Sequence, residues 1–258
     1  MSYPAIRITF LGTGTSTGVP MIGCDCEVCR SSDQRDKRFR SSILVESSRT
    51  RLVIDTTPDF RCQMLRNKVK NLDAVVFTHP HKDHIAGLDD IRAFNFFSGK
   101  PMPVYANEMT QEVIIREFAY AFADTKYPGL PEITLRTIST DPFTIGDIPI
   151  IPILVWHLKM PVFGYRFGPF TYITDANRID GPEKEKIRGS QAIVVNALRN
   201  EKHVSHFNLN EASELARELK IPQAYFTHIS HQLGKHELVN SKLPPGMQLA
   251  YDQLVLEF

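Results

Sequence analysis

The segment Thr78–His84 constrains the fold of this 258-residue chain more than any other stretch. It reads H-x-H-x-D-H and follows an apolar run, Ala74–Thr78, that predicts a strand. Within six positions it offers four ligands that a borderline divalent metal accepts, at His79, His81, Asp83 and His84. These ligands are too crowded for one ion. The segment therefore predicts two ions, about 3.5–4 Å apart, that share a hydroxide and stabilise both oxygens of a displacement.

Three other predicted strands also end in a residue type that binds metals. Ile150–His157 ends in His157, Thr171–Thr174 is followed by Asp175, and Gln223–Thr227 is followed by His228. Ligand sites of α/β proteins commonly lie at the carboxyl ends of strands. We therefore expect these residues to share one site with the H-x-H-x-D-H segment.

Short β-rich runs alternate with helical stretches along the whole chain. Further strands are predicted at Arg7–Leu11, Ser42–Glu46, Arg51–Asp55, Val104–Ala106, Ile133–Ser139, Val162–Phe167, Ala192–Asn196 and Leu249–Leu256. Start signals predict helices that open at Thr57-Pro58, at Asn107, and at Asn208, where Glu211 completes a capping box. No internal repeat or linker is evident, so we expect a single domain over residues 1–258.

The composition argues against two classes of partner. A net charge of +1 provides no broad basic field, which disfavours binding to long nucleic acid. The most apolar region, residues 148–158, is interrupted by Pro149 and Pro152 and is too short to cross a bilayer. The first residues lack the basic and apolar segments of a signal peptide. We therefore expect a cytoplasmic protein with no membrane partner.

Three of the four cysteines are clustered, at Cys24, Cys26 and Cys29. A Cys-x-Cys pair is poorly placed for an unstrained disulfide, and nothing indicates export, so metal binding is the better interpretation. Cys62 falls inside a predicted helix and is expected to be an ordinary buried thiol.

Taken together, the four strand ends resemble those of the metallo-β-lactamase-fold hydrolases, whose ligands follow in this chain order. The resemblance implies an α/β (α+β) fold, a four-layer αββα sandwich. It also implies that a first metal is held by His79, His81 and His157, a second by Asp83, His84 and His228, and that Asp175 bridges both. Asp55 resembles the early buried aspartate that orients the metal loop in this family, although a turn aspartate before Pro58 would look the same.

A narrower resemblance is to the phosphoribosyl 1,2-cyclic phosphodiesterase-like (PhnP-like) branch. It rests on the glycine-rich segment Gly12–Pro20, the cysteine segment Gly23–Cys29 and the late segment Thr227–His231. The branch implies a closed Cys₃His structural zinc site, which would be formed here by Cys24, Cys26, Cys29 and His231. Because His231 lies three residues after His228, such a zinc would fix the position of a catalytic ligand. His236 is a weaker candidate for the fourth ligand.

The branch implies hydrolysis of a small cyclic phosphodiester, such as a phosphoribosyl cyclic phosphate, with manganese or zinc as the catalytic metals. An alkoxide leaving group needs a proton donor. His206 is our candidate, because His206–Ala212 resembles the H-x₄-E-A segment of family phosphodiesterases, and His203 is a weaker one. Asp83 is expected to be catalytic as well as a ligand, and Thr15 or Ser16 to touch the substrate.

Other functions of the same fold remain alternatives. They are a tRNA 3′-processing endonuclease, a thioester hydrolase, a diiron oxidoreductase, a cofactor-biosynthesis protein and a non-catalytic metal scaffold. The sequence shows no long basic arm for tRNA, and His84 favours hydrolysis over diiron redox chemistry. We therefore expect a small phosphodiester as substrate and leave a homodimer open.

Overall fold

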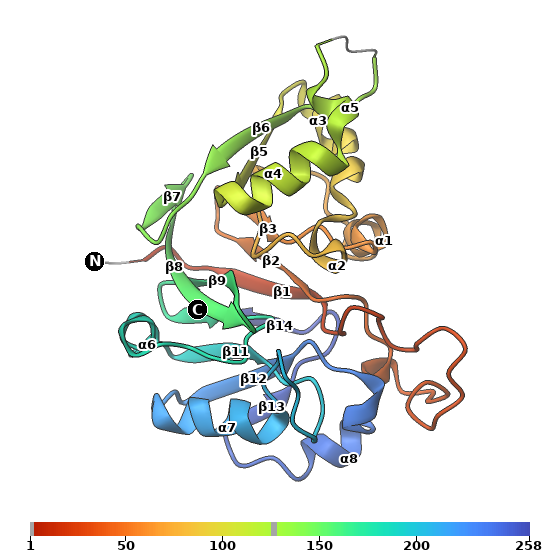
Figure 1. The fold of residues 1–258 in the computed structure, drawn as a ribbon, viewed down its shortest axis with the longest axis vertical. Coiled ribbons are helices and arrows are strands. Elements are labelled where there is room, and N and C mark those ends of the chain that lie inside the picture. The colour runs from red at the N-terminus through yellow and green to blue at the C-terminus, as the bar shows by residue number, and fades with distance from the viewer. Residues whose placement is uncertain (1–2, 125–127) are drawn as a thin grey trace.

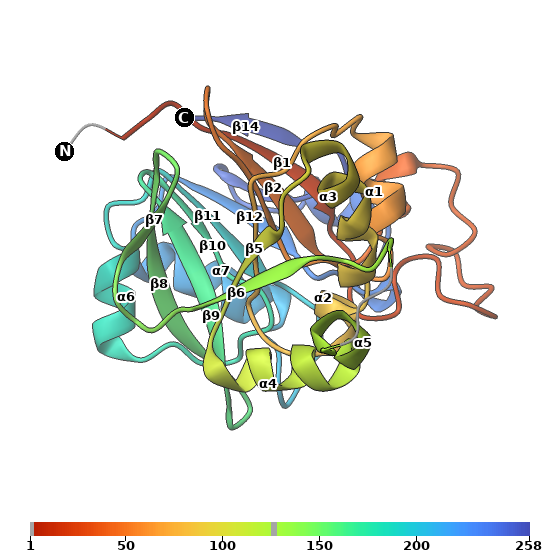
Figure 2. The ribbon, with the colours of Figure 1, turned by 90° about the horizontal axis from the view of Figure 1, so that it is seen from above.

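The computed structural model describes residues 3–124 and 128–258 of the chain. Two sheets face each other, and helices cover the outer side of each sheet (Figure 1, Figure 2). This arrangement confirms the predicted four-layer αββα sandwich. The segment between the first two strands, red to orange in Figure 1, extends from one side of the sandwich.

The first sheet has the strand order β14-β1-β2-β3-β4-β5-β6. Its strands are β14 (Val255–Glu257), β1 (Arg7–Gly12), β2 (Ser42–Glu46), β3 (Arg51–Ile54), β4 (Ala74–Val76), β5 (Met102–Ala106) and β6 (Ile133–Thr137). The four strands from β3 to β6 are parallel. The first half of the chain also forms the helices α1 (Phe60–Arg66), α2 (Lys82–Ile85), α3 (Arg92–Ser98), α4 (Glu108–Glu117) and α5 (Ala119–Phe122), and the short 3₁₀ turns η1 (Gln34–Asp36) and η2 (Leu88–Ile91).

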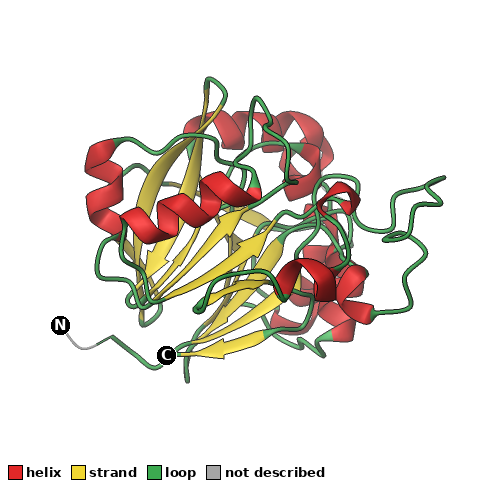
Figure 3. Ribbon diagram, turned by 90° about the horizontal axis from the view of Figure 1, so that it is seen from below, coloured by secondary structure: helices red, strands yellow, loops and turns green. Residues whose placement is uncertain are grey.

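The second sheet has the order β13-β12-β11-β10-β9-β8-β7. Its strands are β13 (Met247–Leu249), β12 (Gln223–Thr227), β11 (Ala192–Asn196), β10 (Phe170–Tyr172), β9 (Met160–Phe167), β8 (Ile148–His157) and β7 (Phe143–Ile145). The second half of the chain also forms α6 (Gly181–Ile187), α7 (Leu209–Glu218), α8 (His236–Asn240) and η3 (His231–Leu233). Figure 3 shows helices on both outer sides of the paired sheets.

Side-chain alternation along the strands explains the layers. Ile43 and Val45 of β2 point into the core between the two sheets, whereas Leu44 points into the core beneath α1 and α3. A strand buried on both faces needs apolar residues at every position, which is why these strands are continuous apolar runs. A third core joins the second sheet to α6 and α7 through residues such as Ile187 and Leu215.

The predicted strand Leu249–Leu256 is wrong, because this segment forms two strands in different sheets. Ala250 donates its backbone N–H to Phe226 of the second sheet, and Gln253 donates to Phe10 of the first. The chain crosses between the sheets with Gln253 in a left-handed conformation (φ 72°). The other eleven predicted strands are confirmed to within two residues at each end.

Two expectations about the first helix are also corrected. The helix α1 begins at Phe60 rather than at Thr57-Pro58, although Phe60 N–H still bonds to the Thr57 carbonyl in a turn before the helix. Cys62 is exposed, not buried, because α1 packs through Phe60, Gln63 and Met64 and turns its other face to solvent. The capping box of Asn208 and Glu211 is confirmed at the start of α7.

Among the described residues, no helix is long and apolar enough to cross a membrane. Residues 1 and 2, part of the segment in which a signal peptide was sought, lie outside the described residues.

Candidate metal centre

The predicted ligands meet at one edge of the sandwich because of the strand directions. The strands β8 and β10 both run antiparallel to β9, and β10, β11 and β12 are parallel, so β8, β10 and β12 end at the same edge. His157 is the last residue of β8, Asp175 follows β10, and His228 follows β12. The first sheet joins this edge where Phe163 of β9 donates its N–H to the Thr78 carbonyl at 3.0 Å.

Four predicted ligands of the second metal lie within ligand distance of one another. The metal-binding atoms of Asp83, His84, Asp175 and His228 are all within 4.8 Å of each other. His84 Nε2 lies 3.3 Å from Asp83 Oδ2 and 3.2 Å from Asp175 Oδ2. His228 Nδ1 lies 3.3 Å from the same Asp175 oxygen, so one carboxylate faces both rings.

The predicted ligands of the first metal lie close to one another. The ring centroids of His79 and His81 are 4.7 Å apart, and that of His157 is 5.1 Å from His81 and 6.0 Å from His79. Ligand atoms of His157, Asp175 and His206 also lie within 4.8 Å of one another. The structure therefore brings all seven predicted catalytic ligands to one place and adds His206 beside them.

Three of the buried histidines of this centre each have one ring nitrogen without a hydrogen-bond partner among the described residues. These atoms are His79 Nε2, His84 Nε2 and His228 Nδ1. Leaving a buried polar atom unpaired costs roughly 1–3 kcal/mol, so such atoms in a native site call for a partner. Metal ions at the centre would satisfy all three, and the donor set of imidazoles and carboxylates suits zinc or manganese.

In His79, His157 and His228, one ring nitrogen contacts a neighbouring residue that orients the ring. His79 Nδ1 lies 2.9 Å from Thr78 Oγ1, and His157 Nδ1 donates to the Ser205 carbonyl at 2.8 Å. His228 Nε2 lies 3.2 Å from the Thr15 hydroxyl. Such outer contacts fix which nitrogen faces the metal.

Asp55 makes the contacts expected of an aspartate that orients the metal loop. Its Oδ2 lies 2.7 Å from His84 Nδ1, and its two oxygens accept hydrogen bonds from the Thr78 amide and hydroxyl at 2.9 and 2.8 Å. Asp55 is fully buried. It therefore ties β3 to both ends of the H-x-H-x-D-H segment.

Burial prepares most of the histidines as metal ligands. It lowers the pKa of His79 and His157 below the usual value and lowers the pKa of His228 to about 4. A histidine must be neutral to bind a metal, and a lowered pKa favours the neutral form of these three rings.

His84 behaves differently, because three carboxylates surround it. Burial opposes its charge, but Asp83, Asp175 and Asp55 together raise the pKa of His84 well above its usual value. In the absence of metal this position therefore attracts a proton. The same excess of negative charge favours a divalent cation.

His206 stands at the edge of the centre, with its side chain 11% exposed. Its Nε2 lies 3.0 Å from Asp175 Oδ1, which leaves the other oxygen of that carboxylate for His84 and His228. Its ring stacks on that of His228 at 4.9 Å, with 14° between the planes, and meets the edge of His157 at 4.6 Å. The predicted proton donor is thus adjacent to the metal ligands.

A second cluster brings together the three clustered cysteines and His231. The sulfur atoms of Cys24 and Cys26 each lie 3.3 Å from His231 Nδ1, and all four ligand atoms, with that of Cys29, are within 4.8 Å of one another. The Cys29 amide donates to Cys26 Sγ, and together with His231 it lowers the pKa of Cys26 to about 6. His236, the rival ligand, instead faces the buried Arg38 at 3.2 Å. The cluster has the composition of a closed tetrahedral zinc site.

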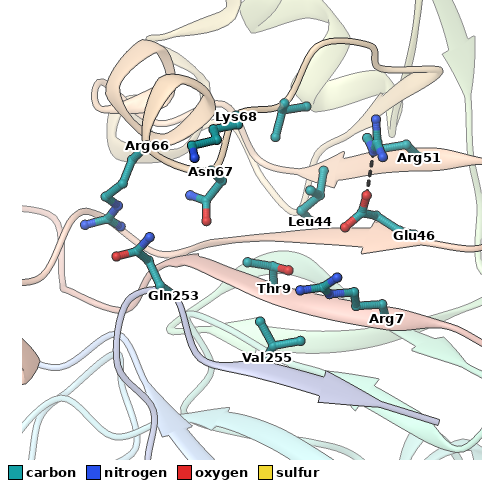
Figure 4. A pocket seen from close by; sticks show the side chains of 11 residues that line it. Arg7, Thr9, Leu44, Glu46, Arg51, Arg66, Asn67, Lys68, Gln253 and Val255 are labelled. Atoms are coloured by element: carbon teal, nitrogen blue, oxygen red, sulfur yellow. Dashed lines mark hydrogen bonds and ion pairs between the residues drawn. The ribbon is translucent and has the colours of Figure 1, made fainter.

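A separate cavity of about 360 Å³ lies between the end of α1 and the strands β1, β2 and β14 (Figure 4). Arg51 in its wall is paired with Glu46 at 2.6 Å. Arg7 and Lys68 also line it. None of the predicted metal ligands lines this cavity, so it is not part of the metal centre.

Comparison with known proteins agrees with this geometry. A family model described as the beta-lactamase superfamily domain matches residues 50–229. The solved structure of a diphosphatase from the PhnP family is 42% identical, with a TM-score of 0.93, over 98% of this chain and 97% of that one. Human tRNase Z, short form, has a TM-score of 0.71 at 16% identity over 97% and 98% of the two chains, a likeness of fold alone.

One curated relative is longer than this chain. An octanoyltransferase of Porphyromonas gingivalis is 36% identical over 252 residues, which are 96% of this chain but 51% of the relative. The chain thus spans about half the length of that protein. The matched family domain and the similarity to the PhnP-family diphosphatase, over nearly the whole of both chains, lead to one conclusion: this chain has the metallo-β-lactamase fold and belongs to the PhnP family of the beta-lactamase superfamily.

Proposed function

We propose that this protein is a dinuclear metal-dependent phosphodiesterase that hydrolyses a small phosphodiester, such as a phosphoribosyl cyclic phosphate. In this proposal His79, His81 and His157 hold one ion, Asp83, His84 and His228 hold the second, and Asp175 bridges them. Manganese or zinc suits this donor set. Cys24, Cys26, Cys29 and His231 hold a structural zinc.

The observation that carries the proposal is the position of His206. It contacts Asp175, the residue shared by both ions, and its ring packs against one ligand from each ion, His157 and His228. Alkoxides are poor leaving groups, and a positioned acid accelerates their departure by about 10²–10⁴-fold. A proton donor beside a two-metal centre is therefore well suited to a phosphodiester of an alcohol.

The ions would supply a water of lowered pKa and would stabilise charge on the phosphoryl oxygens. In the reaction, residues of the chain position the substrate and transfer a proton. The attacking water gives up one proton to solvent as its oxygen forms a bond to phosphorus, and the bond from phosphorus to the leaving oxygen breaks. His206 holds its proton at Nε2 and passes it to that leaving oxygen. For a cyclic phosphodiester, the product is a phosphomonoester. It carries the added oxygen on phosphorus and keeps the released hydroxyl group on the same molecule.

Hydrolysis of a diphosphate linkage is a second candidate. It is favoured by the 42% identity to a PhnP-family diphosphatase over nearly the whole chain. Both reactions attack a phosphorus atom with a bridging oxygen as leaving group, and a diphosphate releases a phosphate that needs less help from an acid.

A substrate panel tests the proposal. The metal-loaded protein is assayed with a phosphoribosyl cyclic phosphate, a 2′,3′-cyclic nucleotide, bis(p-nitrophenyl) phosphate, a dinucleoside diphosphate, a tRNA precursor and an octanoyl thioester. We expect the highest kcat/KM on a small phosphodiester. Preferred cleavage of the dinucleoside diphosphate would select the second candidate, and preferred cleavage of the tRNA or the thioester would contradict both.

A further inference from the structure

We infer that His203 is a positioning residue that holds the ring of His206 in the orientation from which it delivers its proton. This inference rests on the proposed function, because it concerns the proton donor of that reaction. It starts from a hydrogen-bonded group formed by His203, Ser205 and His206. In this group, His203 and Ser205 contact the ring nitrogen of His206 that does not face Asp175.

The contacts of this group converge on one nitrogen of His206. His206 Nδ1 lies 3.2 Å from His203 Nδ1 and 2.9 Å from the Ser205 hydroxyl. The same hydroxyl lies 3.2 Å from His203 Nδ1. Because the other nitrogen of His206 faces Asp175, the ring is held at both ends.

The backbone defines the direction of the bond between the two histidines. The Ser205 amide points its N–H at His203 Nδ1 across 3.4 Å, so this nitrogen carries a lone pair and no proton. In its contact with His206, His203 is therefore the acceptor and His206 Nδ1 is the donor. A 180° flip of the His206 ring would put carbon atoms in the places of Nδ1 and Nε2, and would break this bond and the contact with Asp175 together.

The loop that carries these residues is also held by bonds that do not involve the His203 side chain. Phe207 exchanges backbone bonds on both sides, accepting from Leu198 at 3.1 Å and donating to Ala176 at 2.7 Å. Asn177 donates its side-chain amide to the Val204 carbonyl at 3.0 Å. Removing the His203 ring should therefore leave His206 Nδ1 with the Ser205 hydroxyl as its remaining contact, and so loosen the ring of His206 without releasing the loop.

Leaving-group dependence distinguishes a positioning role from a structural one. An alkoxide needs the proton of His206, whereas p-nitrophenolate leaves without it. We expect His203→Ala to lower kcat on a 2′,3′-cyclic nucleotide by about 10-fold or more, part of the acid contribution. KM for that substrate and kcat on bis(p-nitrophenyl) phosphate should stay within about 2-fold of wild type. His203→Asn, whose side-chain oxygen can accept the same bond, should restore most of the loss.

A spectroscopic measurement tests the contact independently of turnover. In the zinc-loaded protein, the Nδ1 proton of His206 should give a hydrogen-bonded imidazole signal that His203→Ala shifts or loses and His203→Asn keeps. Val204→Ala is the matched control, since this side chain is 71% exposed in the same loop. It should change neither the signal nor the rates.

The possible failures are distinct. A wild-type protein that hydrolyses neither diester overturns the proposed function, and this role of His203 with it. If the wild type hydrolyses both, an equal loss on the two substrates in His203→Ala, or no loss on either, overturns the inference alone. An unchanged His206 signal in His203→Ala has the same meaning.

Discussion

Three residues of the metal centre adopt a backbone conformation that side chains other than glycine rarely adopt. Asp55, Asp175 and His228 have φ values of 66°, 53° and 55°. Left-handed backbone at such residues costs roughly 1–3 kcal/mol each and persists only where the surroundings enforce it. Each follows a strand end, where the turn directs the side chain back across the sheet edge toward the centre. These three conformations therefore lower the stability of the fold and serve to orient side chains of the metal centre.

At the same scale, His206→Ala should reduce kcat on an alkyl phosphodiester by about 10²-fold or more, because the leaving oxygen loses its proton donor. The metal content should not change, because the two proposed ligand sets do not include His206. Kinetics combined with elemental analysis of the purified variant checks this. A parallel loss of metal would make His206 a ligand.

At the scale of elements, one short segment after β12 serves both metal clusters. His228 belongs to the catalytic centre and His231 to the cysteine cluster. Between them, Ile229 exchanges backbone hydrogen bonds with Thr13 and Thr15 of the glycine-rich loop after β1, at 2.9 and 3.1 Å. The cysteine segment follows the same loop along the chain. A metal bound at the cysteines would therefore restrain both sides of His228, a proposed ligand of the other centre.

Cys26→Ser should therefore remove one zinc per chain and also reduce turnover. The loss of one thiolate opens a tetrahedral site, and the segment that carries His228 then loses its anchor at His231. Metal stoichiometry and kcat are measured on the same preparation, with the exposed Cys62→Ser as a control. Full activity together with a lost zinc would show that the two clusters are independent.

The approach of α1 to the metal loop depends on the absence of a side chain at Gly87, just after α2. A Cβ there would collide with the Thr57 carbonyl oxygen and lie 2.6 Å from Phe60 Cβ. Gly87→Ala should lower the free energy of unfolding by about 2 kcal/mol, as measured by denaturant titration.

Gly181→Ala in α6 is the matched control for this substitution, because an added Cβ there meets no atom within 4 Å. It should be neutral or stabilising, by up to about 1 kcal/mol. Equal stability of the two variants would contradict the packing argument.

At the scale of the whole molecule, a buried tyrosine links the two sheets beneath the metal centre. Tyr165 of β9 donates its hydroxyl to the Phe77 carbonyl at 2.5 Å, two residues before His79. Burial raises the pKa of Tyr165 well above its usual value, so the hydroxyl remains a donor. The bond holds the start of the metal loop, in the first sheet, against the strand layer that supplies His157 and Asp175.

Tyr165→Phe should lower the free energy of unfolding by roughly 1–3 kcal/mol, because the buried Phe77 carbonyl loses its donor. Denaturant titration at fixed metal content measures this loss. Tyr105→Phe is the control, since the hydroxyl of Tyr105 has no hydrogen-bond partner within the described ranges. A Tyr165 variant as stable as this control would show that the link contributes nothing.

The layers of this fold, and the residue types that gather at its edge, were readable from local sequence. Apolar runs such as Ala192–Asn196 predict strands because a strand buried on both faces needs them, and this strand was predicted with its observed bounds. The H-x-H-x-D-H segment is equally local, since each predicted ligand lies one or two positions after the previous one. The capping box at Asn208 was also predicted, because its two bonds lie within four residues.

Only the tertiary structure decided how these parts are held together. The hydroxyl of Thr15 meets His228 across 213 positions, and the Ser205 carbonyl meets His157 across 48. A backbone carbonyl or a single hydroxyl gives no signal in residue type, so no pattern in the chain identifies these partners. The split of residues 249–256 between two sheets is decided in the same way, by which neighbouring strands accept its backbone bonds. The sequence alone determined which ligands are present, and packing between distant segments determined which nitrogen of each ring faces the centre.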